Sequence, residues 1–461
     1  MDEVGMEAGL KEAREFLEQN PDINSIDLMI GDINGVIRGK RIPRDSLLKA
    51  YEDGICLPAS LFALDINGNT IEETGLGLDQ GESDRLCFPV PGTLSRTPWQ
   101  DRPCAQVLMS MFENNRAPFI YDPRHVLQRV LDRFAELKLT PVVAVETEFY
   151  VVDRERDEWQ QLQPPVSPVT GKRDTQCQVY SLSDLDDHCD FIEAIHEAAQ
   201  TQRLPVDTAI AECAPGQFEI NLKHRNNAMQ ACDEAVLLKR LIKGVAARHQ
   251  MDATFMAKPY NQEAGSGTHI HVSLLDEQGN NVFKGEADDP LGSAVLKSAI
   301  AGTLGLMPES MVIFAPNANS YRRFQPGFYV PMSQTWGADN RTVAVRIPGG
   351  SDEARRLEHR VAGADANPYL LMASILAGIH YGITQRLTPP APVVGNGYAS
   401  HPPSLPSSWI QALEQWQRNE LLPDYLGREF CRVYHANRHG ERLLFMRNVS
   451  PQEFDWYLRS V

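Results

Sequence analysis

The pattern of apolar and polar positions changes along the chain at about residue 113. Before this point, short apolar runs are separated by glycine and proline, as at 88–92, which indicates short strands joined by turns. After it, helical and strand-like patterns alternate up to about residue 385, where a proline-rich stretch begins. The pattern predicts an α+β protein with two domains, a small strand-rich one over 1–113 and a large one over 114–461.

A helix is predicted near the start of the larger domain. Asp122 is a suitable N-cap, and Pro123 suits the first helical turn, where its missing N–H removes no hydrogen bond. The apolar residues that follow recur at helical spacing, at Val126, Leu127, Val130, Leu131 and Phe134. One stripe of this helix should therefore face the core. The polar stretch 153–174 has no such period and is interpreted as a surface excursion.

Composition narrows the functional classes. The 461 residues are 42% hydrophobic and 23% charged, as in a globular protein with a large core. The formal net charge of −17 argues against a nucleic-acid surface, which needs clustered lysine and arginine. No apolar run of about 18 residues occurs, so no membrane span is expected. The acidic, amphipathic N-terminal segment is unlike a secretory signal, which favours a cytoplasmic location.

The eight cysteines are scattered over the chain, and none forms a Cys-x-x-Cys pair. In a cytoplasmic protein this arrangement is typical of reduced thiols. The sequence therefore predicts neither a disulfide scaffold nor a thiolate-bound zinc site. The residues concerned are Cys56, Cys87, Cys104, Cys177, Cys189, Cys213, Cys232 and Cys431.

The most informative strand pattern lies at 141–152. Most of its positions are apolar, which indicates a buried strand rather than an exposed edge. Glu146 and Glu148 are two residues apart, so their side chains point to one face, with Cα atoms about 6.5–7 Å apart. Two like charges in a half-buried strand are costly unless a cation compensates them. The alternative is the solvent-facing side of an amphipathic strand.

Three further segments carry polar groups of the same kind. Glu212 and Glu219 flank a Pro-Gly turn, which can bring both carboxylates to one side of a sheet. Glu358 lies among arginines. After a glycine-rich turn, one strand face presents three polar side chains, those of His269, His271 and Ser273. A lone histidine is more often a satisfied core residue than a ligand, but two on one face favour a binding site.

The five carboxylates of these segments, together with a histidine and without a cysteine, form an oxygen-rich set of possible ligands. Such a set suits Mg²⁺ or Mn²⁺, the usual partners of nucleotide phosphates. Arginine supplies bidentate donors for carboxylates and phosphates. Candidates lie in the same part of the chain, at Arg322, Arg323, Arg341, Arg346, Arg356 and Arg360. Each alone is equally compatible with a surface or structural role. Together, the two groups are the parts of a phosphoryl-transfer site, although no Walker loop or kinase glycine-rich loop is present.

Short segments in a fixed order along the chain resemble the glutamine synthetase family. They are 31–35, 146–148, 258–259, 265–271, 319–323, 340–341, 346–348, 356–360 and 365–369. Any one of them is weak, but the ordered set covers nearly the whole chain. The resemblance implies an N-terminal β-grasp domain and a large catalytic domain built on a curved antiparallel sheet flanked by helices. It also implies ATP, two or three Mg²⁺ or Mn²⁺ ions, and L-glutamate with a small amine as ligands.

Carried over residue by residue, the resemblance assigns two metal sites. One ion is held by Glu148, Glu212 and Glu219, and the other by Glu146, His269 and Glu358. The implied ATP contacts are His271, Ser273, Arg341, Arg346 and Arg356. The implied substrate contacts are Gly265, Arg323, Arg360, Tyr180 and Tyr329.

The resemblance also implies catalytic residues and an assembly. The catalytic residues are Glu212, Arg341 and Asp32, the last of which matches an ammonium-site aspartate supplied by a neighbouring subunit. A hexameric ring or a stacked dodecamer is therefore implied, with active sites at the subunit interfaces.

One loop departs from the family at the acceptor site. Ordinary members have Pro-Gly-Tyr-Glu-Ala-Pro, whose glutamate closes over ammonium, whereas 326–331 places Tyr329 at that position. An acid that encloses a small cation is thus replaced by an aromatic surface. Two further departures agree, Leu57–Leu61 in place of Phe-Asp-Gly-Ser-Ser and Ala264 in place of asparagine. They predict an acceptor larger than ammonia, as in the γ-glutamyl-amine ligases.

The expected reaction joins an amine to the γ-carboxylate of glutamate through γ-glutamyl phosphate. A bulky or aromatic monoamine is favoured over a polyamine such as putrescine, because the sequence shows no second acidic site for a far ammonium. One alternative is an ordinary glutamine synthetase, for which ammonia would be the best acceptor. The other is a catalytically silent structural or regulatory member, which would release no phosphate in response to an amine.

Overall fold

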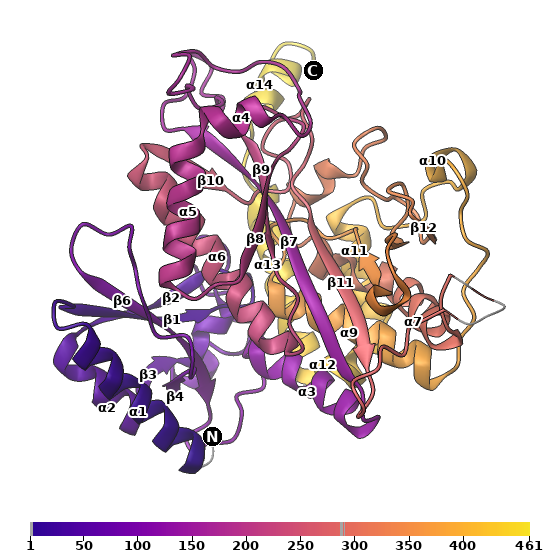
Figure 1. The fold of residues 1–461 in the computed structure, drawn as a ribbon. Coiled ribbons are helices and arrows are strands. Elements are labelled where there is room, and N and C mark those ends of the chain that lie inside the picture. Colours follow the sequence, from indigo (N-terminus) through magenta and orange to yellow (C-terminus); the bar gives the residue numbers. More distant parts are fainter. Residues whose placement is uncertain (1–2, 286–288, 290) are drawn as a thin grey trace.

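The N-terminal part of the chain forms a six-stranded sheet in the order β2-β1-β6-β4-β3, with β5 paired to β6. The computed structural model describes residues 3–285, 289 and 291–461 (Figure 1). β1 and β6 run parallel, and the other pairs are antiparallel. The strands are β1 (Ser25–Gly31), β2 (Ile37–Pro43), β3 (Ile55–Pro58), β4 (Asp84–Pro89), β5 (Ser95–Arg96) and β6 (Cys104–Phe112). Helices α1 (Glu3–Gln19) and α2 (Leu47–Asp53) pack together beside it.

A larger, eight-stranded sheet follows, in the order β12-β13-β14-β11-β7-β9-β8, with β10 paired to β7. Its pairs are antiparallel apart from β12 with β13. The strands are β7 (Thr140–Asp153), β8 (Val206–Ala211), β9 (Gln217–Leu222), β10 (Met251–Thr254), β11 (Thr268–Leu275), β12 (Trp336–Ala338), β13 (Val345–Ile347) and β14 (Leu357–His359). In Figure 1, β7 and β11 are the long neighbouring strands at the centre of the molecule.

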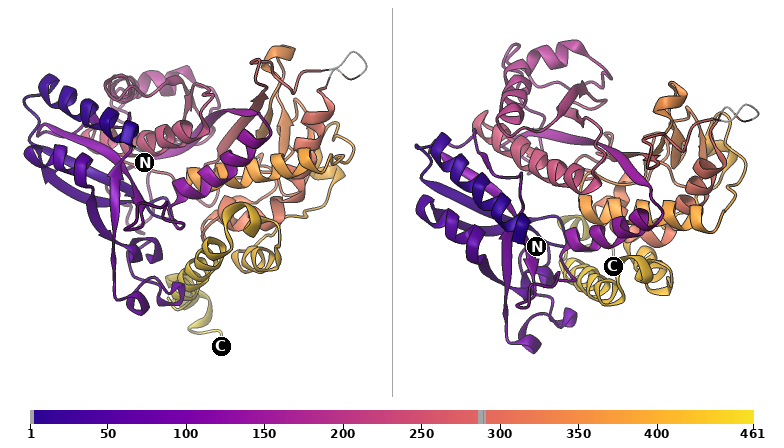
Figure 2. Two further views of the ribbon diagram at one scale, coloured as in Figure 1. Left: turned by 90° about the horizontal axis from the view of Figure 1, so that it is seen from below. Right: turned by 60° about the horizontal axis from the view of Figure 1, so that its bottom comes forward.

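Helices cover this sheet and fill the C-terminal part of the chain. They are α3 (Pro123–Glu136), α4 (Leu182–Asp187), α5 (Cys189–Thr201), α6 (Ala228–Arg248), α7 (Ala294–Gly305), α8 (Met307–Phe314), α9 (Pro368–Thr384), α10 (Gly397–Ser400), α11 (Trp409–Arg418), α12 (Leu422–Leu426), α13 (Arg428–Met446) and α14 (Pro451–Tyr457). Both views of Figure 2 place the N-terminal sheet at one side of the molecule and the segment around α10 at the other. The predicted combination of sheets and helices is therefore present.

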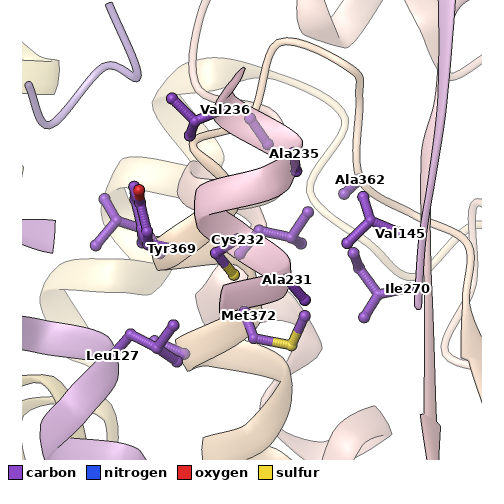
Figure 3. Packing of buried hydrophobic residues seen from close by; sticks show 14 of the residues in the cluster. Leu127, Val145, Ala231, Cys232, Ala235, Val236, Ile270, Ala362, Tyr369 and Met372 are labelled. Carbon is purple, nitrogen blue, oxygen red and sulfur yellow. The ribbon is translucent and has the colours of Figure 1, made fainter. Parts of the chain in front are cut away.

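Alternation along β7 and β11 separates the core from the polar face. Val145 and Ile270 are buried and lie toward α6 and α9, where Figure 3 shows them opposite residues such as Ala231 and Met372. Burying one such aliphatic side chain contributes roughly 1.5–3 kcal/mol. Because neighbours along a strand point to opposite faces, the residues next to Val145 and Ile270 project away from the helices. The apolar contacts thereby fix which face of the sheet carries the polar side chains.

Helix α3 begins as predicted. The side chain of Asp122 accepts a hydrogen bond from the backbone N–H of Arg124 at 2.9 Å, and Pro123 occupies the first turn. The buried residues include Val126, Leu127, Val130 and Phe134, with Leu131 partly buried against the core. The sequence prediction for this helix is confirmed.

The two expected domains share one core. Strand β6 ends at Phe112 and α3 begins at Pro123, on either side of the expected boundary. A single cluster of buried apolar residues nevertheless runs through both parts. Helix α13 also joins them, because the Asn437 side chain donates hydrogen bonds to the carbonyls of Ala63 and Leu64, both at 3.0 Å. The division at residue 113 stays a prediction.

The cysteine prediction is wrong for one pair. Cys177 and Cys213 form a disulfide with Cα atoms 4.9 Å apart, whereas the other six cysteines are free. The segment before α4 lies beside β8, because the Tyr180 N–H donates to the Ala211 carbonyl at 2.9 Å and the Gln178 N–H donates to the Cys213 carbonyl at 3.1 Å. Tertiary pairing thus joins two cysteines that are 36 residues apart in the sequence, and their spacing gave no sign of it.

Among the described residues, none of the helices combines the length and apolar character needed to cross a membrane.

Candidate active site

The centre of the polar face is set by the register of β7 with its two neighbours. Glu148 lies opposite Glu219 of β9, and Glu146 lies opposite His269 of β11. Directly paired residues in antiparallel strands have neighbouring side chains on the same face. Strand pairing therefore places two carboxylates side by side and a histidine next to a third.

The next two strands extend this row. His271 lies opposite Glu358 of β14, which in turn lies opposite Arg346 of β13. His269, His271 and Ser273 alternate along β11, as the sequence predicted for one strand face. Five adjacent strands, β13, β14, β11, β7 and β9, thus contribute polar groups to one continuous surface.

All six expected metal ligands come together here. Three groups have one potential ligand atom per residue, all within 4.8 Å of one another. They are Glu148 with Glu212 and Glu219, Glu146 with Glu219 and His269, and Glu146 with His271 and Glu358. The first, called here the carboxylate triad, matches one expected site. The other expected set, Glu146 with His269 and Glu358, is not one of the groups found among the described residues, because His271 takes the place of His269 beside Glu146 and Glu358. Both histidines approach the oxygens of Glu146, Nδ1 of His269 at 3.5 Å and Nε2 of His271 at 2.9 Å.

Like charges crowd the carboxylate triad. Burial, followed by the charge of Glu212, raises the pKa of Glu148 to about 7. Burial, followed by the charge of Glu148, raises the pKa of Glu219 to about 9, and burial also raises the pKa of Glu212. One oxygen of Glu148 accepts a hydrogen bond from the Gly267 N–H at 2.7 Å, which offsets only part of this effect. The triad thus holds more negative charge than its protein surroundings neutralise.

The Glu358 cluster, consisting of Glu146, His269, His271 and Glu358, behaves in the opposite way. Burial would raise the pKa of Glu358, but Arg360, the two histidines and Arg346 lower it to about 2. For Glu146, hydrogen bonds from His269 and His271 outweigh burial and hold its pKa well below the usual range. Burial and Arg360 lower the pKa of His269, which favours the neutral imidazole that binds metal ions.

This donor set fits a divalent cation. The triad offers only carboxylate oxygens, which Mg²⁺ and Mn²⁺ prefer, and contains no thiolate. A cation there would offset both the burial and the mutual repulsion that raise the three pKa values. The residues that would hold it are Glu148, Glu212 and Glu219, with the Glu358 cluster beside them.

Arginines surround the carboxylates. Arg346 contacts Glu358 at 2.9 Å and Asp339 at 2.6 Å, and Arg360 also pairs with Glu358. Arg356 donates a hydrogen bond from Nε to Nδ1 of His271 at 3.1 Å. Of the expected ATP contacts, His271 and Ser273 therefore lie on β11 with part of the Glu358 cluster, Arg346 lies on the adjacent β13, and Arg356 directly precedes β14.

The expected glutamate contacts lie beside the triad. Arg323 is 3% exposed and donates to the Val361 carbonyl at 2.7 Å. A Cβ added to Gly265 would lie 2.5 Å from the Ala257 carbonyl oxygen and 2.7 Å from the Arg323 side chain. Only glycine therefore allows the backbone to approach Arg323 this closely.

Tyr180 and Tyr329 lie at exposed positions with left-handed backbone angles, φ = 61° and 55° respectively. The Tyr180 hydroxyl accepts a hydrogen bond from Nη1 of Arg341 at 3.4 Å. Tyr329 is 64% exposed, and the neighbouring Phe328 ring has Nζ of Lys258 3.8 Å from its centroid. The loop at 326–331 thus presents an open aromatic surface with a lysine against it.

Asp32 is placed differently from the other expected residues. Its side chain is fully buried, pairs with Arg38 at 3.0 Å, and accepts hydrogen bonds from the N–H groups of Asn34 and Val36, both at 2.9 Å. These contacts fix the turn between β1 and β2. The geometry favours a structural role for this carboxylate over contact with an amine.

Sequence reasoning gave no role to two residues near the site, Asp339 and Lys258, although Lys258 lies in one of the family segments. Asp339 binds Arg346, and Lys258 covers Phe328. Asp339 lies just before the 340–341 motif, so an acid beside the arginine segments was the available signal. Nothing in the sequence pattern indicated that Lys258 would meet the aromatic loop.

Comparisons with known proteins agree with this geometry. The family described as "Glutamine synthetase, catalytic domain" matches residues 120–457. The chain is 48% identical to gamma-glutamylputrescine synthetase PuuA of Escherichia coli K12. The aligned 451 residues cover 98% of this chain and 95% of that protein. It is 33% identical to a glutamate–isopropylamine ligase of a Pseudomonas species, with coverages of 91% and 92%.

The solved structures include a close match over nearly the full length. The structure described as "GmaS/ADP complex-Conformation 1" has a TM-score of 0.83 at 26% identity, covering 98% of this chain and 99% of that one. The fold, the carboxylate triad and these similarities point to the same family. The chain belongs to the glutamine synthetase family.

Proposed function

We propose that this protein is an ATP-dependent ligase that joins L-glutamate to a primary amine larger than ammonia, through γ-glutamyl phosphate. The single observation that carries the proposal is the carboxylate triad, whose uncompensated charge suits the divalent cations of a nucleotide site. The names of the similar proteins supply the reaction class, because two of them are ligases or synthetases that act on amines.

Arg323, Arg360 and the Gly265 backbone would hold glutamate, with its γ-carboxylate toward the triad. His271, Ser273, Arg341, Arg346 and Arg356 would hold the nucleotide. Two or three Mg²⁺ or Mn²⁺ ions, when bound, would neutralise charge on the transferred phosphoryl group. Arginine donors beside that group would stabilise its oxygens through bidentate hydrogen bonds. Glu212 and Arg341 are the proposed catalytic residues next to the acceptor.

Putrescine is the first candidate for the acceptor, because the 48% identical relative is named for it. A bulky or aromatic monoamine is the second candidate. The aromatic surface of Phe328 and Tyr329 favours it, and Lys258 against Phe328 disfavours a second ammonium nearby. Both are larger than ammonia, and Tyr329 replaces the acid that would enclose ammonium.

Assembly completes the proposal. We expect the N-terminal sheet to be a β-grasp domain that lies against a neighbouring subunit in a cytoplasmic hexameric ring or stacked dodecamer. A role for Asp32 at that interface would require its bonds to Arg38 and the β1–β2 turn to open.

An acceptor screen tests the proposal. Phosphate release would be measured with ATP, glutamate and Mg²⁺ against ammonia, putrescine, spermidine, isopropylamine and phenethylamine, and the γ-glutamyl products identified by mass. The amines should exceed ammonia by at least about tenfold in kcat/KM. In the Tyr329→Glu variant, this preference should shrink toward ammonia. Ammonia as the best acceptor would overturn the assignment, and no amine-dependent phosphate release at all would favour a silent family member.

A further inference from the structure

The Cys177–Cys213 disulfide lies at the edge of the proposed active site. Cys213 directly follows Glu212 of the carboxylate triad, and Cys177 is three residues before Tyr180. Tyr180 contacts Arg341, whose positive charge lowers the pKa of Glu212 against the effect of burial. One covalent bond therefore links the residue next to Glu212 of the triad to the segment that carries Tyr180.

Few other contacts attach the segment 174–180, which contains Cys177 and Tyr180, to the sheet. It has no helix or strand between Arg173, which pairs with Asp153 at 2.6 Å, and Ser181, which caps α4. Two backbone hydrogen bonds join it to the end of β8 and to Cys213, through the N–H groups of Tyr180 and Gln178. Residues 175–180 are exposed along their whole length. Without the disulfide, these two backbone hydrogen bonds and the Tyr180–Arg341 contact would have to hold a solvated chain segment against its conformational entropy.

The disulfide is accessible to small reagents. Cys177 is exposed and Cys213 half-buried, in contrast to the deeply buried Cys87 and Cys232. Accessible disulfides are the ones that thiol–disulfide exchange reaches, and in a reducing compartment such bonds are usually regulatory rather than structural.

We propose that Cys177 and Cys213 form a redox-sensitive latch, which favours amine binding when the disulfide closes and weakens it when the disulfide opens. This inference rests on the proposed ligase function. Opening is an exchange with a dithiol: the Cys177–Cys213 bond breaks, each of its sulfurs gains one electron and one proton, and the dithiol gives up these two electrons and two protons and becomes a disulfide. Closing transfers the same electrons and protons to a small disulfide such as oxidised glutathione, which leaves as two thiols.

The first test measures kinetics with the pair in each state, established by thiol alkylation and mass spectrometry. A water-soluble phosphine opens the bond without binding Mg²⁺, and oxidised glutathione closes it. Opening should raise the KM for putrescine by about fivefold and change kcat by less than about twofold, because the change concerns binding. Cys177→Ser should match the reduced enzyme under both conditions. Cys189→Ser, which alters an exposed cysteine outside the disulfide, should respond as the wild type does.

Hydrogen exchange provides a readout that does not depend on activity. The amides of Gln178 and Tyr180 should exchange at least about tenfold faster after reduction and in Cys177→Ser. Unchanged exchange together with an unchanged KM, in protein whose bond is shown to be open, would overturn the latch. So would a failure of the two cysteines to pair under oxidised glutathione. If neither redox form releases phosphate with any amine, the proposed function fails, and hydrogen exchange alone then decides whether the segment is latched.

Discussion

The carboxylate triad and the Glu358 cluster lie on the same sheet face but differ in how far neighbouring positive groups compensate their buried negative charge. In the Glu358 cluster, arginines and histidines surround the acids and hold the pKa of Glu358 at about 2. In the triad, three carboxylates meet with few cationic partners, and the pKa of Glu219 rises to about 9. The protein itself neutralises much of the charge in the first region, whereas the second keeps a charge that a bound cation would offset. The comparison shows that two groups of acids on one sheet face differ in how much of their charge the protein compensates.

The largest expected effect comes from removing a triad ligand. Glu148→Gln should lower amine-dependent phosphate release by about 1000-fold, because several kcal/mol of charge stabilisation by the metal ions is lost. Unfolding without Mg²⁺ should show no loss of stability, since one repelling charge is gone. Glu193→Gln, on the exposed face of α5, serves as the control and should keep full activity. A large loss of stability in Glu148→Gln would show that the triad is neutralised by the protein after all.

Glu358→Ala should lower the free energy of unfolding by more than Glu148→Gln does. It leaves Arg346 and Arg360 without their shared carboxylate in a buried site, which costs about 3–5 kcal/mol of unfolding free energy. Denaturant unfolding in the absence of metal measures it. A loss below about 1 kcal/mol, as for a surface ion pair, would remove the contrast between the two regions.

The two regions should also respond to opposite changes in pH. Because the folded triad binds more protons than the unfolded chain, stability without metal should fall as the pH rises from about 4.5 through about 7 to about 9. Because the folded pKa of Glu358 is lowered to about 2, its contribution is present above about 4.5 and is lost as the pH falls toward 2. Thermal unfolding across this range, with and without Mg²⁺, measures both. Saturating Mg²⁺ should remove the alkaline fall, and an unchanged alkaline limb would contradict metal binding by the triad.

The smallest effect is expected for Arg346→Lys. The lysine keeps the charge but cannot bridge Glu358 and Asp339 with a planar fork, so stability should fall by about 1 kcal/mol. The loss of stability at low pH should then begin at a higher pH, because the pKa of Glu358 is lowered less. An unchanged onset of this loss would assign the low pKa to Arg360 and the histidines alone.

Local patterns in the sequence were sufficient for much of this site. The two-residue spacing of Glu146 and Glu148, and that of His269 and His271, set their common faces because the strand period is 2. The helix at Asp122–Pro123 followed from capping chemistry. The order of the short family motifs along the chain carried the family and the reaction class.

Long-range contacts decided the rest. Strand register brought Glu219 opposite Glu148 and Glu358 opposite His271, and only this pairing separates a repelling triad from a neutralised cluster. Tertiary pairing also joined Cys177 to Cys213 and enclosed Asp32 within its own turn. The sequence alone determined which side chains share a face, because that depends on neighbours along one strand. The tertiary structure decided which charges meet, because burial and Coulomb energy depend on distances between residues that the chain order does not specify.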